Sequence, residues 1–300
     1  MAKHSLKKMR EKCIFFVLGG FFALFAGDNA GVEGFVGWCF HYLFLFLRAI
    51  FIYKNLPVML QKTRGIVLRT IKYKDTAQIA TIYTEVAGRV SFRVPVTRSR
   101  HASVRSSQFQ PLALVELEAD FRRTARVCVL NGARPFVPFV SLPFHPYKSA
   151  MALFLAEVLY EVLCEGGEDS PLFAYLVNAL IWLDRCPEGF SNFHLVFLMR
   201  LLRFVGLHPN VEGYVPGCWF DLRSACFTAA RPVTHSDFLW PQEAELLPRL
   251  LRMNFDTMRF FTFSRQQRAR CLDVIIDYYC LHVPGFHRPK SLEVLHELFD

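Results

Sequence analysis

Arginine and lysine side chains are concentrated in one segment of the chain, residues 59–140. This segment holds 14 Lys and Arg residues against 5 Asp and Glu residues, a net charge of +9 that equals the net charge of all 300 residues. Guanidinium and ammonium groups donate hydrogen bonds to phosphate oxygens. A small cationic module therefore indicates a polyanionic ligand, with nucleic acid as the first choice.

The side chains predicted to hold that ligand come from short strands and from a Ser/Arg loop over residues 97–110. Cations would neutralise phosphates and rings would stack on bases, although a solvated loop and core rings are the structural alternatives. The candidate cations are Lys72, Lys74, Arg89, Arg93, Arg98, Arg100 and Arg105, and the candidate rings are Tyr73 and Phe109.

A second candidate site lies in the apolar segment 192–206, which carries His194, Arg200 and Arg203. The histidine is expected to be a core residue. The two arginines share one helix face and need an anion, either Glu157 or Glu161 of the preceding helix or an acidic peptide from a partner protein. For such a peptide we predict a pocket lined by Phe197 and rimmed by Arg200 or Arg203.

The sequence contains no recognisable catalytic or metal-binding motif. The chain has no phosphate-binding Gly-rich loop, no HExxH, no GxSxG and no acidic cluster suited to a two-metal nuclease, so we predict that it is not an enzyme. Nine cysteines occur without a CxxC pair, which favours reduced thiols. Cys218 and Cys226 are eight residues apart and do not form the short-spaced pair that zinc requires.

The hydrophobic pattern of the sequence predicts strands in the first part of the chain after residue 59 and helices in the second part. Alternating patterns predict strands over residues 64–71, 77–84, 89–96, 112–119 and 125–131, which fit a small OB-type barrel. Helical periodicity follows over residues 147–164, 172–184, 192–206, 242–252, 265–282 and 291–299. The predicted fold is α+β multidomain, with an OB-fold domain at 59–138 and a helical domain at 139–300 that has a non-helical insertion at about 207–241.

Residues 1–58 differ in composition from the rest, with a basic start and two apolar runs. They resemble a secretory signal or a membrane anchor over residues 13–53, but Met59 as the natural start is the favoured interpretation. A membrane-anchored basic protein is therefore the alternative function. If Met59 is the start, we expect no membrane association.

Several runs of residues carry a family resemblance. TRGIVLRTIKYKDTAQIATIYTEVAGRVSFRVPVTRSR and SSQFQPLALVELEAD resemble the N-terminal module of the bacterial RecO family of DNA repair and recombination proteins. SLPFHPYKSAMALFLAEVLYEVL and FHLVFLMRLLRFVGLHPN resemble its helical half. The similarity runs from Met59 to the end, which independently favours Met59 as the start.

The resemblance implies a non-enzymatic, cytoplasmic and nucleoid-associated protein. RecO-like proteins bind single- and double-stranded DNA, anneal strands, contact the acidic C-terminal tail of the single-stranded DNA-binding protein SSB, and with RecR help to load RecA. Many members hold zinc with four cysteines in the stretch that here reads HPNVEGYVPGCWFDLRSACF. Only Cys218 and Cys226 remain, so we predict no metal and no cofactor. We expect that an aromatic-rich loop packs in its place, formed by Tyr214, Trp219, Phe220 and Phe227.

Overall fold

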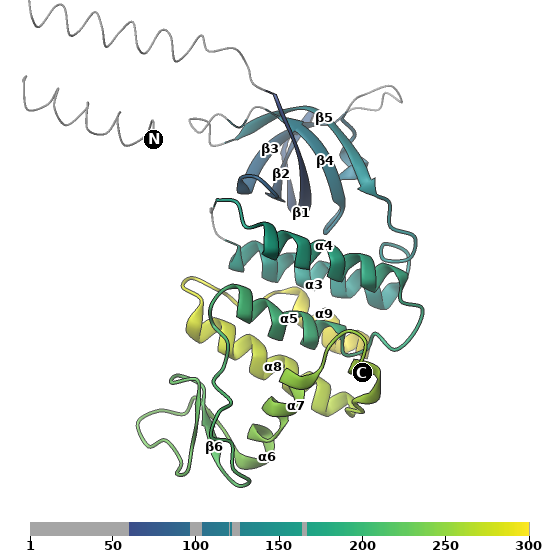
Figure 1. The fold of residues 1–300 in the computed structure, drawn as a ribbon. Coiled ribbons are helices and arrows are strands. Elements are labelled where there is room, and N and C mark those ends of the chain that lie inside the picture. The colour runs from purple at the N-terminus through teal and green to yellow at the C-terminus, as the bar shows by residue number, and fades with distance from the viewer. Residues whose placement is uncertain (1–59, 97–103, 120, 122–126, 164–166, 300) are drawn as a thin grey trace, which may run out of the picture. The chain divides into compact units, whose positions relative to one another are not determined.

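The computed structural model describes residues 60–96, 104–119, 121, 127–163 and 167–299 (Figure 1). The chain divides into two units at Met59 and Leu60, and every described residue belongs to the second unit. The predictions for residues 1–58, Arg98 and Arg100 lie outside the described residues. In the described part of the chain, no helix has the length and apolar character needed to cross a membrane.

Five strands close into a barrel in the order β1-β2-β3-β5-β4. All neighbours are antiparallel except β3 and β5, which pair in parallel through Phe92 with Cys128 and Arg93 with Val129. This closed five-stranded arrangement confirms the predicted barrel. The strands are β1 (Gln61–Lys74), β2 (Ala77–Thr84), β3 (Gly88–Pro95), β4 (Leu114–Ala119) and β5 (Cys128–Val137).

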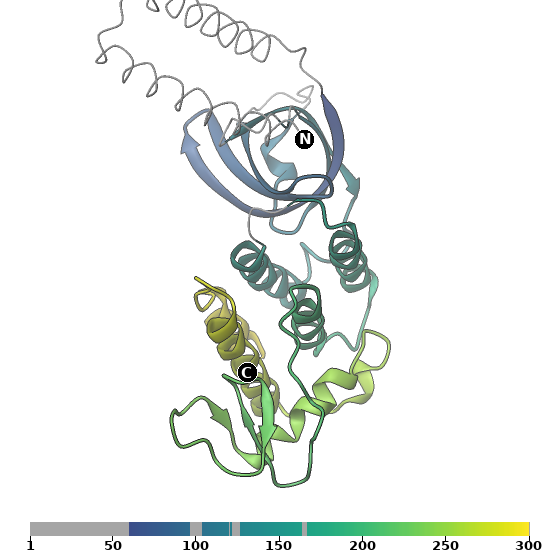
Figure 2. The same cartoon turned by 60° about the vertical axis from the view of Figure 1, so that its left-hand side comes forward.

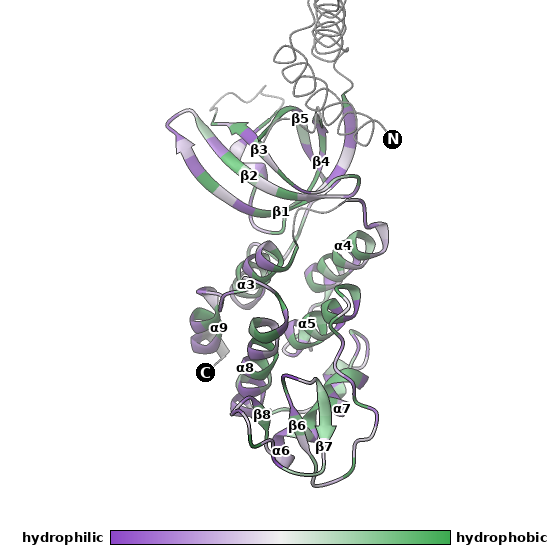
Figure 3. Cartoon of the chain, turned by 90° about the vertical axis from the view of Figure 1, so that its left-hand side faces the viewer, coloured by the Kyte–Doolittle hydropathy of each residue, from purple (hydrophilic) through white to green (hydrophobic). Residues whose placement is uncertain are grey.

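Side chains alternate between the inside and the outside of the barrel, as a pleated strand requires. In β3, Phe92 and Val94 are fully buried, while Arg93 is exposed. Along the strands in Figure 3 the colour alternates between hydrophobic green and hydrophilic purple. Gly65 lets β1 approach β2 closely, because a Cβ there would lie 2.5 Å from Ile82 Cγ2.

The last barrel strand extends six residues beyond its predicted end at Asn131. Sequence patterns alone place Pro135 outside a strand, because proline donates no hydrogen bond. In the structure β5 pairs with β3 only at Cys128 and Val129, so its later half has β4 as its single partner. Pro135 is tolerated there, next to a register shift opposite Val115.

Helices follow the barrel, and the first two lie directly beneath it (Figures 1 and 2). Their bounds are close to those predicted, except that residues 242–252 form two helices. Pro248 has no N–H to bond to the carbonyl of Ala244, which separates α6 from α7. The helices are α3 (Pro146–Val162), α4 (Ser170–Arg185), α5 (Phe193–Phe204), α6 (Pro241–Ala244), α7 (Leu246–Arg252), α8 (Arg265–His282) and α9 (Ser291–Phe299), with short 3-10 turns η1 (Ser106–Gln108) and η2 (Met258–Phe260).

One hydrophobic core spans the barrel and the helices, and it includes Ile66, Leu68 and Leu114 from the barrel and Phe154 and Leu159 from α3. A second core fills the interior of the barrel. The segment that joins them is held by the buried carboxylate of Asp184. Its oxygens accept hydrogen bonds from the backbone N–H groups of residues 140–142 at 2.7–3.1 Å.

Lys148 completes this junction from the first turn of α3. Its buried ammonium donates to Ser141 Oγ, to the Asp184 carbonyl and to the Cys186 carbonyl, at 2.7, 3.1 and 2.6 Å. Burial lowers the pKa of Lys148, and the neighbouring charges of Cys186 and Asp184 act against that shift. The path of the chain from barrel to helices is therefore determined by a polar network.

The insertion between α5 and α6 forms a small antiparallel sheet in the order β7-β6-β8. Its strands are β6 (Trp219–Asp221), β7 (Cys226–Thr228) and β8 (Phe238–Leu239). The sheet lies at the end of the helices that is remote from the barrel (Figures 1 and 2).

Candidate nucleic-acid interface

The outer surface at the β1–β2 hairpin end of the barrel combines cations with exposed apolar side chains. Ile71 pairs with Ile79, Ile79 with Arg93, and Arg93 with Val129, which places these four in one row across β1, β2, β3 and β5. Ile71 is 46% exposed and Val129 is 63% exposed. We call Ile71, Lys72, Tyr73, Lys74, Arg93 and Val129 the hairpin surface.

Tyr73 lies at a bulge in β1, and the residue is 56% exposed. Lys74 Nζ lies 5.6 Å from the centre of that ring. Lys72 Nζ lies 3.0 Å from Asp75 Oδ1, but both side chains are exposed, and such pairs contribute little. The hairpin tip therefore offers a ring flanked by two accessible ammonium groups, which is the combination that stacks bases and neutralises phosphates.

Two of the predicted arginines are exposed, Arg93 within the hairpin surface and Arg105 outside it. Arg93 is exposed and forms no ion pair with a described carboxylate. Arg105 is exposed immediately before η1, where its backbone N–H donates to Gln108 Oε1 at 3.2 Å. Exposed apolar neighbours such as Ile71 and Val129 were missed by sequence reasoning, because alternation alone assigns apolar residues to the core.

Arg89 does not belong to this surface, and its prediction as a DNA contact is corrected. Its Nη1 donates to the Tyr160 carbonyl of α3 at 2.6 Å, and its guanidinium lies 5.2 Å from the centre of the Tyr160 ring. Arg69 lies over the same ring at 5.0 Å. These two arginines hold the barrel against α3, a role that no local pattern in the strands indicates.

Phe109 is buried, so it cannot stack on a base as predicted. Its side chain is 2% exposed and belongs to the barrel core with Phe92 and Val94. The adjoining carbonyl accepts a hydrogen bond from Thr70 Oγ1 at 3.0 Å. The ring therefore packs inward, and Tyr73 is the predicted ring that faces solvent.

The second candidate site differs from its prediction at Phe197, which is fully buried and cannot line an open pocket. Arg200 and Arg203 are exposed on α5, and neither forms an ion pair with a described carboxylate. The acids considered as their partners are engaged elsewhere: Glu157 accepts from Ser291 N at 2.9 Å, and Glu161 lies 3.7 Å from His287.

The accessible rings near these arginines come from other elements. Arg200 lies 5.5 Å from the centre of the Phe255 ring, and Tyr175 stacks on Phe204 with ring centres 4.8 Å apart. Tyr175 and Phe255 are half-buried, and Phe204 is 40% exposed. A cation beside partly exposed rings is thus present on this face, although Phe197 is not among them.

His194 is a core histidine, as expected. It is 1% exposed, and burial, together with the charges of Arg268 and His296, lowers its pKa to about 3. The imidazole is neutral at physiological pH. It therefore belongs to the packing of α5 rather than to a binding site.

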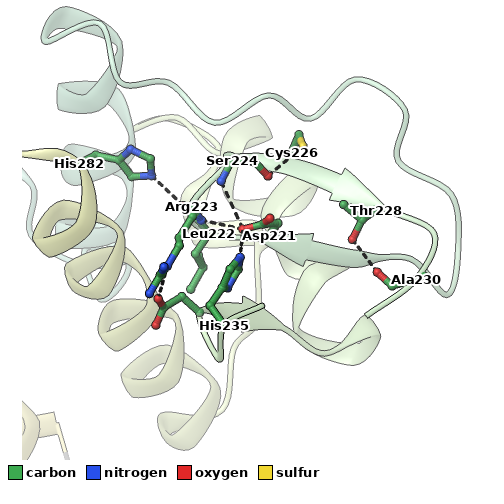
Figure 4. Close-up of polar contacts among 10 residues, drawn as sticks. Asp221, Leu222, Arg223, Ser224, Cys226, Thr228, Ala230, His235 and His282 are labelled. Carbon is green, nitrogen blue, oxygen red and sulfur yellow. Dashed lines mark hydrogen bonds and ion pairs between the residues drawn. The ribbon is translucent and has the colours of Figure 1, made fainter. Parts of the chain in front are cut away.

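The small sheet has no set of residues suited to zinc. Cys218 is buried, Cys226 Sγ contacts Ser224 Oγ at 3.2 Å, and residues 167–299 contain no cluster of three or more possible ligands. The Asp221 carboxylate is already engaged: its Oδ1 accepts from Arg223 N at 2.8 Å and Ser224 N at 3.2 Å, and lies 3.5 Å from His235 Nε2 (Figure 4).

Burial alone would raise the pKa of Asp221, but the hydrogen bonds from Ser224 and Arg223 and the charge of His235 outweigh it and lower the pKa.

The predicted aromatic loop is formed in part. Tyr214 and Phe220 pack on Phe227 with ring centres 5.2 and 5.0 Å apart, as predicted. Trp219 packs on Phe238 and Trp240 instead.

Two family models match this chain. The model described as recombination protein O N terminal covers residues 59–139, and the model described as recombination protein O C terminal covers residues 144–293. The chain belongs to the RecO family. The barrel and the helical region correspond to its two described parts.

Curated relatives agree with this assignment. The chain is similar to DNA repair protein RecO of Bacteroides fragilis, with 54% identity over 242 residues, which is 81% of this chain and 100% of the relative. The RecO protein of Phocaeicola vulgatus is 53% identical over the same coverage, and that of Flavobacterium johnsoniae is 33% identical over 80% of this chain and 99% of the relative. None of these names describes an enzymatic activity.

Proposed function

We propose that this RecO-family protein binds single- and double-stranded DNA through the hairpin surface and Arg105. The observation that carries this proposal is the gathering of Lys72, Lys74, Arg93 and the exposed Tyr73 ring at one end of the barrel. Contacts to phosphates and base faces carry no sequence code, so we expect little sequence preference.

Annealing follows from the same contacts. Two complementary strands repel each other less once cations neutralise their phosphates, and base pairing then requires no covalent chemistry. We therefore propose that the protein anneals strands without enzymatic activity. Its membership of the RecO family further leads us to propose that it works with RecR to load RecA onto SSB-coated DNA, in the cytoplasm at the nucleoid.

For the acidic SSB tail we propose the α5 face with Arg200 and Arg203. Arg200 beside Phe255, and Tyr175 stacked on the exposed Phe204, supply a cation and apolar rings for a peptide that carries carboxylates and an aromatic residue. This placement replaces the pocket predicted around Phe197.

An annealing assay tests the proposed function. Complementary oligonucleotides, one of them labelled, are mixed with the full chain and Mg²⁺ and followed over time. We expect faster duplex formation than without protein, with strands of intact length. Unchanged annealing would contradict the proposal, and shortened strands would instead indicate a nuclease.

A further inference from the structure

The outward face of the small sheet carries aromatic rings where a solvent face ordinarily carries polar side chains. Phe220 lies opposite Phe227 and Leu239, and both Phe220 and Leu239 are buried. Since side chains alternate along a strand, Trp219 and Phe238 lie on the other face, with Trp240 next to β8. We call Trp219, Phe238, Trp240 and Arg231 the tryptophan face.

The rings of the tryptophan face contact one another closely. Trp219 lies 4.5 Å from Trp240 and 5.2 Å from Phe238, measured between ring centres. Trp240 is 51% exposed, while Trp219 and Phe238 are half-buried beneath it. One large ring is therefore held in a defined position with much of its surface open to a ligand.

Arg231 adds a cation to these rings. Its guanidinium lies 5.0 Å from the centre of the Phe238 ring and 5.8 Å from that of Trp240. Carboxylates of this part of the chain are taken by other groups: Asp237 bonds Arg223 and Glu243 bonds Arg270, both at 2.6 Å, and Asp221, on the same face, lies 3.5 Å from His235. Arg231 itself forms no ion pair within residues 167–299, so its N–H groups can donate to a ligand anion.

We propose that the tryptophan face is a second contact for single-stranded DNA, in which a base stacks on Trp240 and Arg231 donates to a phosphate. Every base has a face that stacks on an aromatic ring, and in a duplex those faces are covered. A stable protein interface ordinarily takes about 20 to 30 residues on each side. Three rings and one arginine instead match one or two bases.

This proposal rests on the proposed DNA binding and extends it to the other end of the molecule. The sheet lies at the end of the helices away from the barrel (Figures 1 and 2), so one strand must pass along the helices to reach both contacts. A short oligonucleotide would occupy the barrel alone. A long one would also touch the tryptophan face, with the intervening length free for pairing.

Photo-crosslinking of the full chain separates the two contacts. Oligothymidylates containing 4-thiothymidine are used at roughly 10 nucleotides, within the span of one OB fold, and at roughly five times that length. Crosslinked peptides are identified by mass spectrometry. We expect the short oligonucleotide to label barrel peptides and the long one also to label the peptide that contains Trp240.

Affinity measurements on variants complete the test. Trp240→Ala is expected to weaken binding of the long oligonucleotide about five-fold or more and to leave the short one unchanged. Arg231→Ala, which removes no buried side chain, should act in the same direction. Phe260→Ala is the matched control, because Phe260 is 68% exposed with Arg259 stacked at 4.8 Å elsewhere in the helical domain.

The outcomes are distinguishable. Crosslinks confined to the barrel, with unchanged affinity in Trp240→Ala and Arg231→Ala, overturn the second contact and leave the proposed function standing. Absence of binding to both oligonucleotides defeats both proposals. Unchanged DNA binding together with lost affinity for an acidic SSB-tail peptide in Arg231→Ala would assign the tryptophan face to a protein partner instead.

Discussion

Tyr73 lies at the β1–β2 hairpin, where the residue is 56% exposed and its ring lies beside the ammonium group of Lys74. An exposed tyrosine ring offers a surface on which a base can stack. Its value as a DNA contact can be measured because truncation leaves the barrel core unchanged.

Tyr73→Ala is expected to weaken binding to single-stranded DNA by about 1 to 3 kcal/mol, the usual loss when a base-stacking ring is removed. Fluorescence anisotropy with a labelled oligothymidylate measures it. Tyr147→Ala is the control, because this ring of the helical domain is also exposed, at 42%. Equal effects of the two substitutions would remove Tyr73 from the interface.

Arg200 and Arg203 carry the second prediction at this scale. Replacing each singly by Ala should weaken binding of a peptide with the SSB tail sequence by about 1 to 3 kcal/mol, as for other charged hydrogen bonds. Isothermal titration calorimetry measures it, with Lys290→Ala as an exposed cation on another segment. Unaltered affinity in both arginine variants would reject this face.

Residue types predicted the candidate cations, but not which of them meet solvent. Arg89 and Arg93 are both expected to point outward from β3, yet Arg89 is bound to Tyr160, which is 71 residues away in the chain. Phe109 follows a serine-rich loop but fills the barrel core. Such partners come together only in the folded chain, so a local pattern cannot distinguish them.

At the scale of elements, strand β2 and helices α8 and α9 have the bounds that the sequence predicts, because period, breakers and caps agree there. Ser264 Oγ, for example, accepts from Gln267 N at 3.1 Å at the start of α8. The small sheet was predicted only as a non-helical insertion. Its strands are two or three residues long and too short to show a period.

Asp184 connects the elements of the barrel–helix junction. Burial by itself would raise its pKa, but the N–H groups of residues 140–142 and the charge of Lys148 lower it. A lowered carboxyl pKa stabilises the fold above the pKa of the unfolded chain, about 3.9 for Asp, and this stabilisation is lost as pH falls through the folded-state pKa.

Asp184→Asn should therefore reduce the free energy of unfolding at pH 7 by about 2 to 4 kcal/mol, because the backbone N–H groups of residues 140–142 lose the charged acceptor of their hydrogen bonds. Urea unfolding at several pH values measures it. The difference from the unsubstituted protein should shrink as pH falls below about 4. A difference that is independent of pH would contradict the assigned role of the carboxylate.

The prediction that this chain holds no zinc belongs to the same scale and is tested at the small sheet, where Asp221 lies. This residue holds the β6–β7 turn and contacts His235, so Asp221→Ala should lower the free energy of unfolding by about 1 to 3 kcal/mol, whereas a chelator should leave the melting temperature unchanged. A double variant, Cys218→Ser with Cys226→Ser, serves as a control, and a chelator should leave its melting temperature unchanged as well. Stoichiometric zinc in the purified protein would defeat this prediction.

At the scale of the whole molecule, the barrel segment carries most of the net positive charge, and several of its cations already have a partner within the protein. Arg64 pairs with Glu85, Arg134 with Glu116, and Arg69 and Arg89 with Tyr160. Net charge therefore overstates the surface available to DNA. The exposed cations proposed for DNA binding are Lys72, Lys74, Arg93 and Arg105.

The most direct measurement is the salt dependence of single-stranded DNA affinity for the full chain and for a variant with Lys72, Lys74, Arg93 and Arg105 all replaced by Ala. If each cation holds a phosphate, the slope of log affinity against log salt concentration should fall in magnitude by about 3, at about 0.7 per contact. An Arg64→Ala and Arg134→Ala variant should keep most of its slope. Equal slopes for the fourfold variant and the unsubstituted protein would contradict a DNA site at this end of the barrel.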